Sequence, residues 1–180
     1  ICIDSEAVIT ASESMQMIRA TTTLAAGTLS DMNTAANLMT TAMEAWNLET
    51  RRSAEVSDIF ASAINASKLT MNGLVTAFNY ITGVAPELNM TLQETSGALA
   101  IMANAGLNAS IAGTSLRAML SSLMAPNERL VSTLRSVGLT INDVSPSTNS
   151  FADILLKLKN AGFSVEKAFQ GLERRASTGI

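Results

Sequence analysis

Between Glu94 and Arg117 the sequence runs for about 22 residues without a charged side chain. A helix of about 20 apolar residues is long enough to cross a bilayer, so this run predicts either a membrane span or a folded hairpin. Its middle and second half contain Asn104, Asn108 and several hydroxyl side chains. Such groups are costly in hydrocarbon when they lack partners. We therefore expect two short helices joined at a corner, and no membrane span.

The apolar residues of this run form two helical stripes, one on each side of the corner. The first stripe comprises Leu92, Thr95, Leu99, Met102 and Ala103, and the second comprises Ala112, Leu116, Met119, Leu120 and Leu123.

Similar corners recur along the chain. In each, a small residue or glycine is followed by an apolar residue and then by Ser, Thr or Asn. Glycine accepts the left-handed conformation after a helix, and the polar side chain accepts hydrogen bonds from the first N–H groups of the next helix. The predicted corners are residues 26–30, 67–70, 105–108, 137–140 and 161–164. Thr91 and Glu94 form a predicted capping box, and Pro126 is expected to end one helix or open the next.

The apolar spacing between corners is helical almost throughout, which predicts an all-α fold of about nine helices. The spacing of the corners favours stacked helical hairpins, in either an α-solenoid-like array or an irregular bundle. We expect a single helical domain over residues 1–180, with a loop at 140–150 that includes a short extended piece at 141–144. Because the chain begins at Ile1 and still reads as helix near its end, we expect a fragment of a longer protein.

The stripe of the first helix comprises Val8, Ala11, Met15, Ile18 and Ala25. The methionines expected to fill the core are Met15, Met39, Met43, Met102 and Met119.

Composition excludes several function classes. Charged residues make up 15% of the chain and the net charge is -3, so no basic surface predicts direct binding of nucleic acid. The chain has no histidine and one cysteine, which removes Ser-His triads and the common zinc sites. Glu13 lies in an amphipathic helix pattern and is better explained as a solvated carboxylate than as a glycosidase acid. We expect no enzyme activity, no cofactor and no metal.

Arg117 ends the uncharged run. We expect it to pair internally or to donate to carbonyl groups at a helix C-terminus; the alternative is contact with a carboxylate of a partner. Arg51 and Arg52 are flanked by Glu49 and Glu55, which predicts ion pairs on an exposed face.

The segments MANAG (residues 102–106) and SIAGTSLR (residues 110–117), followed by Leu120, Leu123 and Pro126, resemble the core of phage tail tape measure proteins. The resemblance extends over nearly all 180 residues, although Ala109 stands where that family usually has glycine. The residues that it marks for a structural or interaction role are Gly106, Ser110, Ala112, Gly113, Thr114, Leu116, Arg117 and Pro126.

This resemblance implies a structural component of a phage or prophage tail, which takes part in tail assembly and length determination. Members of the family are long, mostly helical chains that template the tail tube, fill its lumen and leave ahead of the DNA. The implied partners are tube, chaperone and end-structure proteins, in the virion tail and, during assembly, in the host cytoplasm. The alternative is a cellular helical-repeat scaffold that binds a protein or peptide in a concave groove.

Overall fold

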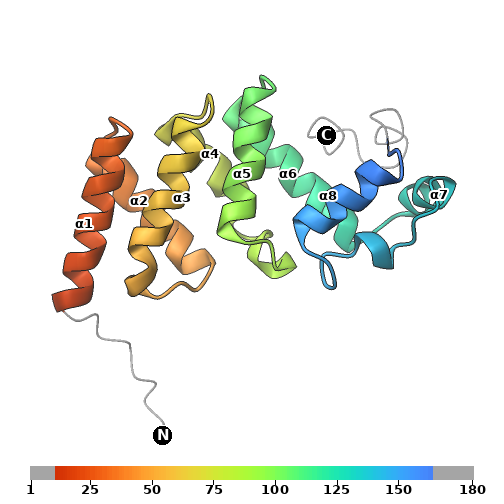
Figure 1. The fold of residues 1–180 in the computed structure, drawn as a ribbon, viewed down its shortest axis with the longest axis horizontal. Coiled ribbons are helices and arrows are strands. Elements are labelled where there is room, and N and C mark those ends of the chain that lie inside the picture. Colours follow the sequence, from red (N-terminus) through yellow and green to blue (C-terminus); the bar gives the residue numbers. More distant parts are fainter. Residues whose placement is uncertain (1–10, 164–180) are drawn as a thin grey trace, which may run out of the picture.

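A computed structural model describes residues 11–163, which contain eight α-helices, three short 3₁₀ helices and no strand (Figure 1). The predicted all-α fold is confirmed, and the count is close to the expected nine. The helical spacing of Val165, Ala168 and Leu172 in the sequence also predicts a helix after Gly162, and these residues lie outside the described part of the chain. The helices are α1 (Ala11–Gly27), α2 (Met32–Ala45), η1 (Thr50–Arg52), α3 (Ser53–Asn65), α4 (Met71–Ile81), η2 (Pro86–Leu88), α5 (Leu92–Asn104), α6 (Ala109–Met124), α7 (Glu128–Ser136), η3 (Asn142–Val144) and α8 (Phe151–Asn160).

The first six α-helices alternate between two layers. Helices α1, α3 and α5 stand side by side in one layer, with α2, α4 and α6 behind them (Figure 1). Each helix packs on the next helix of its own layer, and the two layers pack on each other. This is the arrangement of stacked hairpins in an α-solenoid. Helices α7 and α8 close against the C-terminal half of α6 through Leu123, Leu134 and Ile154.

The core runs along the length of the stack between the two layers. Phe60 of α3 and Phe78 of α4 meet edge to face with their ring centroids 5.3 Å apart, and Trp46 lies 5.7 Å from Phe78. The two stripes predicted for α5 and α6 lie in this core. Helical spacing in the sequence also predicts apolar stripes in α2, α3 and α4, and all of their residues lie in or against the core: Ala35, Met39, Ala42, Met43 and Trp46; Val56, Ile59, Phe60, Ala63 and Ile64; and Leu74, Phe78 and Ile81. Four of the five predicted core methionines are buried: Met39, Met43, Met102 and Met119.

Most of the predicted apolar stripe of α1 is wrong, although Ala25 is buried as expected and Val8 lies outside the described residues. Met15 and Ile18 are 54% and 55% exposed, whereas α1 buries Ala20, Thr21, Leu24 and Ala25 near its C-terminal end. Helix α1 is the first described helix of its layer and has a neighbour in that layer, α3, on one side only. A stripe read from the sequence cannot tell which side of a helix has a neighbour.

The uncharged run folds as a hairpin. Helices α5 and α6 meet at residues 105–108, and the two stripes predicted for them are buried. Gly106 has a φ of 95°, and the Leu107 N–H donates to the Met102 carbonyl at 3.1 Å, which is the closing bond of a Schellman motif. Among residues 11–163, no helix is both long and apolar enough to span a membrane.

Three further signals are confirmed. Asn108 and Thr70 cap α6 and α4 by accepting the N–H groups of Ile111 and Gly73. The Thr91–Glu94 capping box is complete, with both reciprocal hydrogen bonds present.

The corner at 67–70 has no left-handed residue. It is held instead by Asn104, whose side-chain amide accepts from the Lys68 N–H and donates to the Ala66 carbonyl.

The corner at 26–30 is displaced toward the C-terminus, so that its left-handed residue lies two positions and its capping residue one position later than predicted. Helix α1 continues through Gly27, so the left-handed residue is Leu29, with a φ of 51°. The side chain that caps α2 is consequently Asp31, which accepts the Thr34 N–H at 2.9 Å. Ser30 instead donates its hydroxyl to the Thr28 carbonyl. The sequence offered two capping residues in succession, and the length of α1 selected the second.

The extended piece predicted at 141–144 is also wrong, because Asn142–Val144 forms the 3₁₀ helix η3. The Asp143 carboxylate accepts hydrogen bonds from both the N–H and the hydroxyl of Thr140, and this closes the turn. Gly138 has the expected positive φ of 77°, but the corner at 137–140 leads into η3 and not into an α-helix. Gly162, with a φ of 69°, ends α8 as predicted.

Candidate interaction surface

Helices α4 and α6 cross closely, with small residues at the contact. A Cβ atom added to Gly113 would lie 2.7 Å from the carbonyl oxygen of Ala77 and 2.9 Å from its Cα. One turn away, a Cβ atom on Gly73 would lie 3.4 Å from the Cβ of Ala109. Each helix therefore presents two small residues four positions apart, which share one face. Their small size lets the two backbones touch.

This crossing explains much of the AGTSLR segment. Ala112 and Leu116 are fully buried, and Gly113 sets the contact with α4. The Ser110 carbonyl accepts the Thr114 hydroxyl at 2.8 Å within α6. Ala112, Gly113 and Leu116 therefore lie in the packing between helices, whereas the Ser110–Thr114 hydrogen bond is internal to α6. Gly106 and Pro126 lie at helix ends, Gly106 at the corner before α6 and Pro126 between α6 and α7, one residue before the Asn127 cap, and Arg117 is exposed on α6.

Arg117 lies on the outside of α6, where it lines an open groove with Tyr80 of α4. The same groove is lined by Thr114, Ser121 and Asn127. Arg117 is exposed and makes no hydrogen bond or ion pair with any residue in the range 11–163. The internal pairing expected from the sequence is not found there. Tyr80 was not singled out from the sequence, and only the crossing of α4 and α6 brings it beside Arg117.

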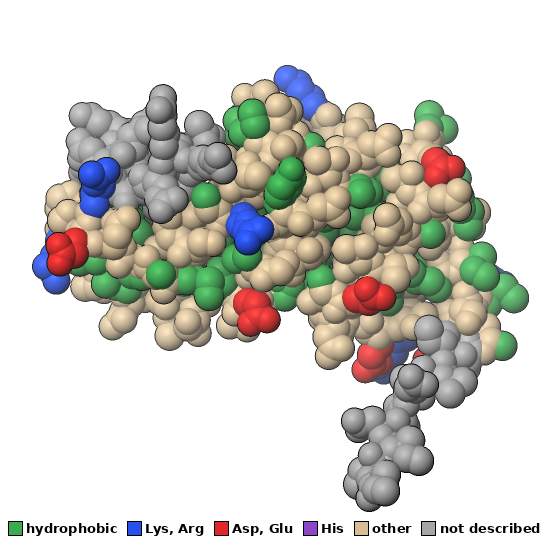
Figure 2. All heavy atoms as spheres, turned by 180° about the vertical axis from the view of Figure 1, so that it is seen from behind, with side chains coloured by type: hydrophobic (Ala, Val, Ile, Leu, Met, Phe, Trp, Pro, Cys, Tyr) green, Lys and Arg blue, Asp and Glu red, His purple; other side chains and the backbone are tan. Residues whose placement is uncertain are grey.

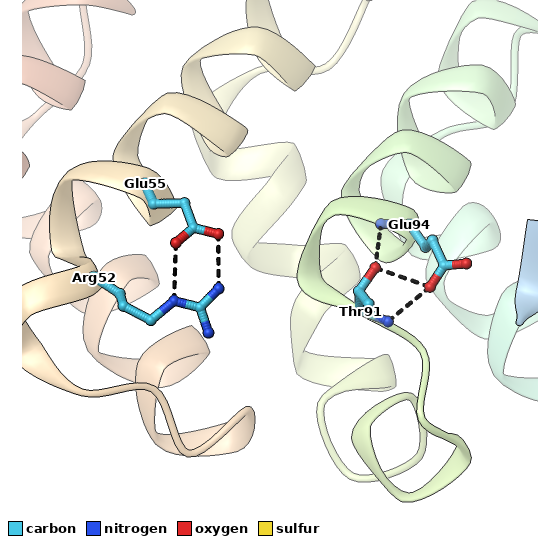
Figure 3. A network of polar contacts seen from close by, with 4 residues as sticks. All are labelled: Arg52, Glu55, Thr91 and Glu94. Carbon is cyan, nitrogen blue, oxygen red and sulfur yellow. Dashed lines mark hydrogen bonds and ion pairs between the residues drawn. The ribbon is translucent and has the colours of Figure 1, made fainter.

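A second groove separates α3 from α5 in the other layer. At the N-terminal ends of these helices lie two polar pairs, Arg52–Glu55 and Thr91–Glu94 (Figure 3). The Arg52 guanidinium donates two hydrogen bonds to Glu55, at 2.7 and 2.8 Å. These bonds lower the pKa of Glu55 and raise that of Arg52 from their ordinary values. Because both side chains are exposed, the pair adds little stability. The predicted ion pairs of Arg51 and Arg52 are confirmed.

The face formed by α2, α4 and α6 carries few charges. Figure 2 views the molecule from behind and shows charged side chains as separate points on a largely uncharged surface. No cluster of metal-ligating side chains occurs among residues 11–163. The described residues thus form two open grooves on the surface and a close contact between α4 and α6.

Comparison with known proteins agrees with this geometry. Residues 5–178 match the phage-related minor tail protein family. The chain belongs to this family. It is 29% identical to the tape measure protein of Pneumococcus phage Dp-1 over 138 residues, which are 77% of this chain and 12% of that protein. It is 26% identical to the probable tape measure protein of Escherichia phage P2 over 115 residues, which are 64% of this chain and 14% of that protein.

The minor tail protein family and these relatives support a structural role in a phage tail. The alternative of a cellular repeat scaffold is not favoured. The matched region spans less than one-sixth of the length of either relative. No solved structure is significantly similar to the chain.

Proposed function

We propose that this chain is the helical core of a longer tape measure protein, a structural and non-enzymatic component that takes part in tail assembly and length determination. It acts in the host cytoplasm during assembly and resides afterwards in the virion tail. Its partners are other tail proteins, such as tube, chaperone or end-structure proteins, and it does not contact nucleic acid directly. The match to tape measure proteins over most of the chain carries this proposal.

Within that role, the core docks to a partner and does not itself measure length. A continuous helix of 180 residues would span about 270 Å at about 1.5 Å per residue. The described helices instead turn back at corners and stack in two layers. Two layers of helices are wider than a single helix of about 10 to 12 Å. The measuring length therefore lies mostly in other segments of the parent chain.

A deletion series tests whether this core docks to a partner while other segments measure the length. Removal of the α2–α3 hairpin, within residues 31–66, breaks the stack, because α4 packs on α2 and α5 packs on α3. We expect such a deletion to abolish or impair tail formation. A deletion of equal length in a continuous helical segment elsewhere in the parent is the matched control, and it should shorten tails by about 1.5 Å per residue removed.

Electron microscopy of the tails gives the readout. Complete tails that are shortened in proportion to the residues removed from 31–66 would show that this region measures length, and the docking proposal would then be wrong. Tails of normal length and number from the same deletion would equally contradict it, since a docking core is required for assembly.

A further inference from the structure

The groove between α3 and α5 is lined by polar side chains, and all of them except Glu55 lack a partner within the described chain. Its walls are formed by Glu55, Asp58 and Ser62 of α3 and by Gln93, Ser96 and Gly97 of α5. Positions 55, 58 and 62 share one face of α3, as positions 93, 96 and 97 share one face of α5. The two faces lie opposite each other across the groove. Small residues at Ser62, Ser96 and Gly97 leave this space unfilled.

Ser96 is the most unusual group in the groove. Its side chain is 1% exposed, yet its hydroxyl oxygen makes no hydrogen bond with any described residue. The neighbouring Thr95 behaves as expected for a hydroxyl in a helix, since it donates to the Thr91 carbonyl one turn earlier. Leaving a buried polar group without a partner is unfavourable. A hydrogen-bonding group that enters the groove from outside can remove that penalty.

The groove also has an unbalanced negative charge. Glu55 is neutralised by Arg52, but Asp58, one turn further along the same face, forms no ion pair with a residue in the described range. Neither the Gln93 amide nor the Ser62 hydroxyl is engaged in a hydrogen bond with a described side chain or backbone group. A carboxylate, an amide oxygen and two hydroxyl oxygens thus line one space. All four can accept hydrogen bonds.

We propose that the α3–α5 groove binds a lysine or arginine side chain presented by another tail protein. The cation pairs with Asp58 and donates to the Gln93 carbonyl oxygen and the Ser96 hydroxyl. Beyond Gln93 the groove continues past the Arg52–Glu55 pair and Ile59 toward Trp46 and Leu48. The last three side chains are partly buried, and this end receives an apolar side chain from the same segment. The inference rests on the proposed docking function and supplies the chemistry of its partner.

Titration of the 180-residue chain with blocked amino acids, followed by NMR of its backbone amides, tests the site. The probe is N-acetyl-lysine methylamide, and N-acetyl-norleucine methylamide is the control because it has a similar carbon chain without the charge. We expect the lysine probe to shift the amides of Gln93, Ser96 and Gly97 in a saturable way, and the norleucine probe to leave them nearly unchanged.

Two variants with the same change in net charge make the test specific. Asp58→Asn should weaken binding of the lysine probe about fivefold or more, because it removes the charge-assisted hydrogen bond. Glu87→Gln, in η2 and outside the groove, should leave binding unchanged. Equal shifts with norleucine, or equal weakening by both variants, would show a nonspecific effect and overturn the proposal.

Ser96→Ala separates binding from folding. If the Ser96 hydroxyl lacks a partner in the free chain, its removal should raise the melting temperature while it weakens binding of the lysine probe. A lower melting temperature would show that the hydroxyl is already satisfied and would remove Ser96 from the site. The titration does not depend on tail length, so the groove can fail this test while the docking function still passes the deletion series.

Discussion

The indole N–H of Trp46 donates a hydrogen bond of 2.7 Å to the carbonyl oxygen of Met90. Trp46 ends α2, whereas Met90 precedes the capping box that begins α5. The same indole ring packs against Phe78 of α4. One side chain at the end of α2 therefore contacts both α4 and the segment that leads into α5, at a position where the two layers of the stack meet.

Replacement of Trp46 by Phe should destabilise the chain by about 1 to 3 kcal/mol, because the buried Met90 carbonyl loses its donor. Tyr80→Phe is the control. The Tyr80 hydroxyl has no hydrogen bond to a residue in the described part of the chain, so its loss should change stability by less than about 0.5 kcal/mol. Urea unfolding followed by circular dichroism measures both, and equal effects would show that the indole hydrogen bond contributes nothing.

Gly113→Ala should destabilise the chain by about 1 to 3 kcal/mol. The added methyl would lie 2.7 Å from a backbone oxygen of α4, and a backbone cannot move aside as a flexible side chain can. Gly97→Ala in α5 meets no heavy atom within 4 Å and should stabilise the helix by up to about 1 kcal/mol. Thermal melts compare the two variants, and a stabilising Gly113→Ala would refute the close crossing.

Gly106→Val tests the corner between α5 and α6. A Cβ at this position meets no atom within 4 Å, so any cost comes from the positive φ of 95° and should amount to about 1 to 3 kcal/mol. Ala109→Gly, at the first position of α6, should cost less than about 1 kcal/mol. Small effects of equal size at both sites, measured by thermal unfolding, would contradict the role of Gly106.

The Asp31 cap makes part of the stability of α2 dependent on pH. The hydrogen bond from the Thr34 N–H lowers the pKa of Asp31 below its ordinary value of 3.8. A lowered pKa means that the cap stabilises the folded chain above the unfolded pKa, and that this contribution is lost as the pH falls through the lower folded value. Hydrogen bonds from Thr140 lower the pKa of Asp143 in the same direction.

Asp31→Asn keeps a capping oxygen but cannot titrate. We therefore expect its stability to fall less steeply than that of the parent chain as the pH is lowered from about 7 to about 2.5. Unfolding in urea at a series of pH values measures the slope. Parallel curves for the two proteins would show that Asp31 does not contribute to the acid sensitivity.

The local structure of the chain was largely predictable from the sequence. The uncharged run predicted the α5–α6 hairpin, because its amides and hydroxyls could not be left in hydrocarbon. Gly106, Asn108 and the Thr91–Glu94 box marked helix ends correctly. These signals are reliable because they act within four or five residues: a positive φ requires glycine or a tolerant residue, and a free N–H requires a nearby acceptor.

The predictions of local structure failed where two local conformations compete. Ser30 and Asp31 are both residues that can cap α2. Because α1 extends through Gly27, the cap falls on Asp31. At 141–144 the sequence predicted an extended segment. In the structure the Thr140 N–H donates a hydrogen bond to the Asp143 carboxylate, and this holds a turn.

Only the tertiary structure decided which faces meet. The exposure of Met15 and Ile18 depends on whether α1 has a neighbour on that side, and the pairing of Gly113 with Ala77 depends on how α4 crosses α6. The spacing of Gly73 and Ala77, matched by that of Ala109 and Gly113, was the one sequence signal for this crossing. Likewise, Asp58 and Ser96 share a groove only because α3 and α5 stand in the same layer. Helix periodicity specifies a buried face, whereas packing between helices distant in sequence specifies what that face contacts.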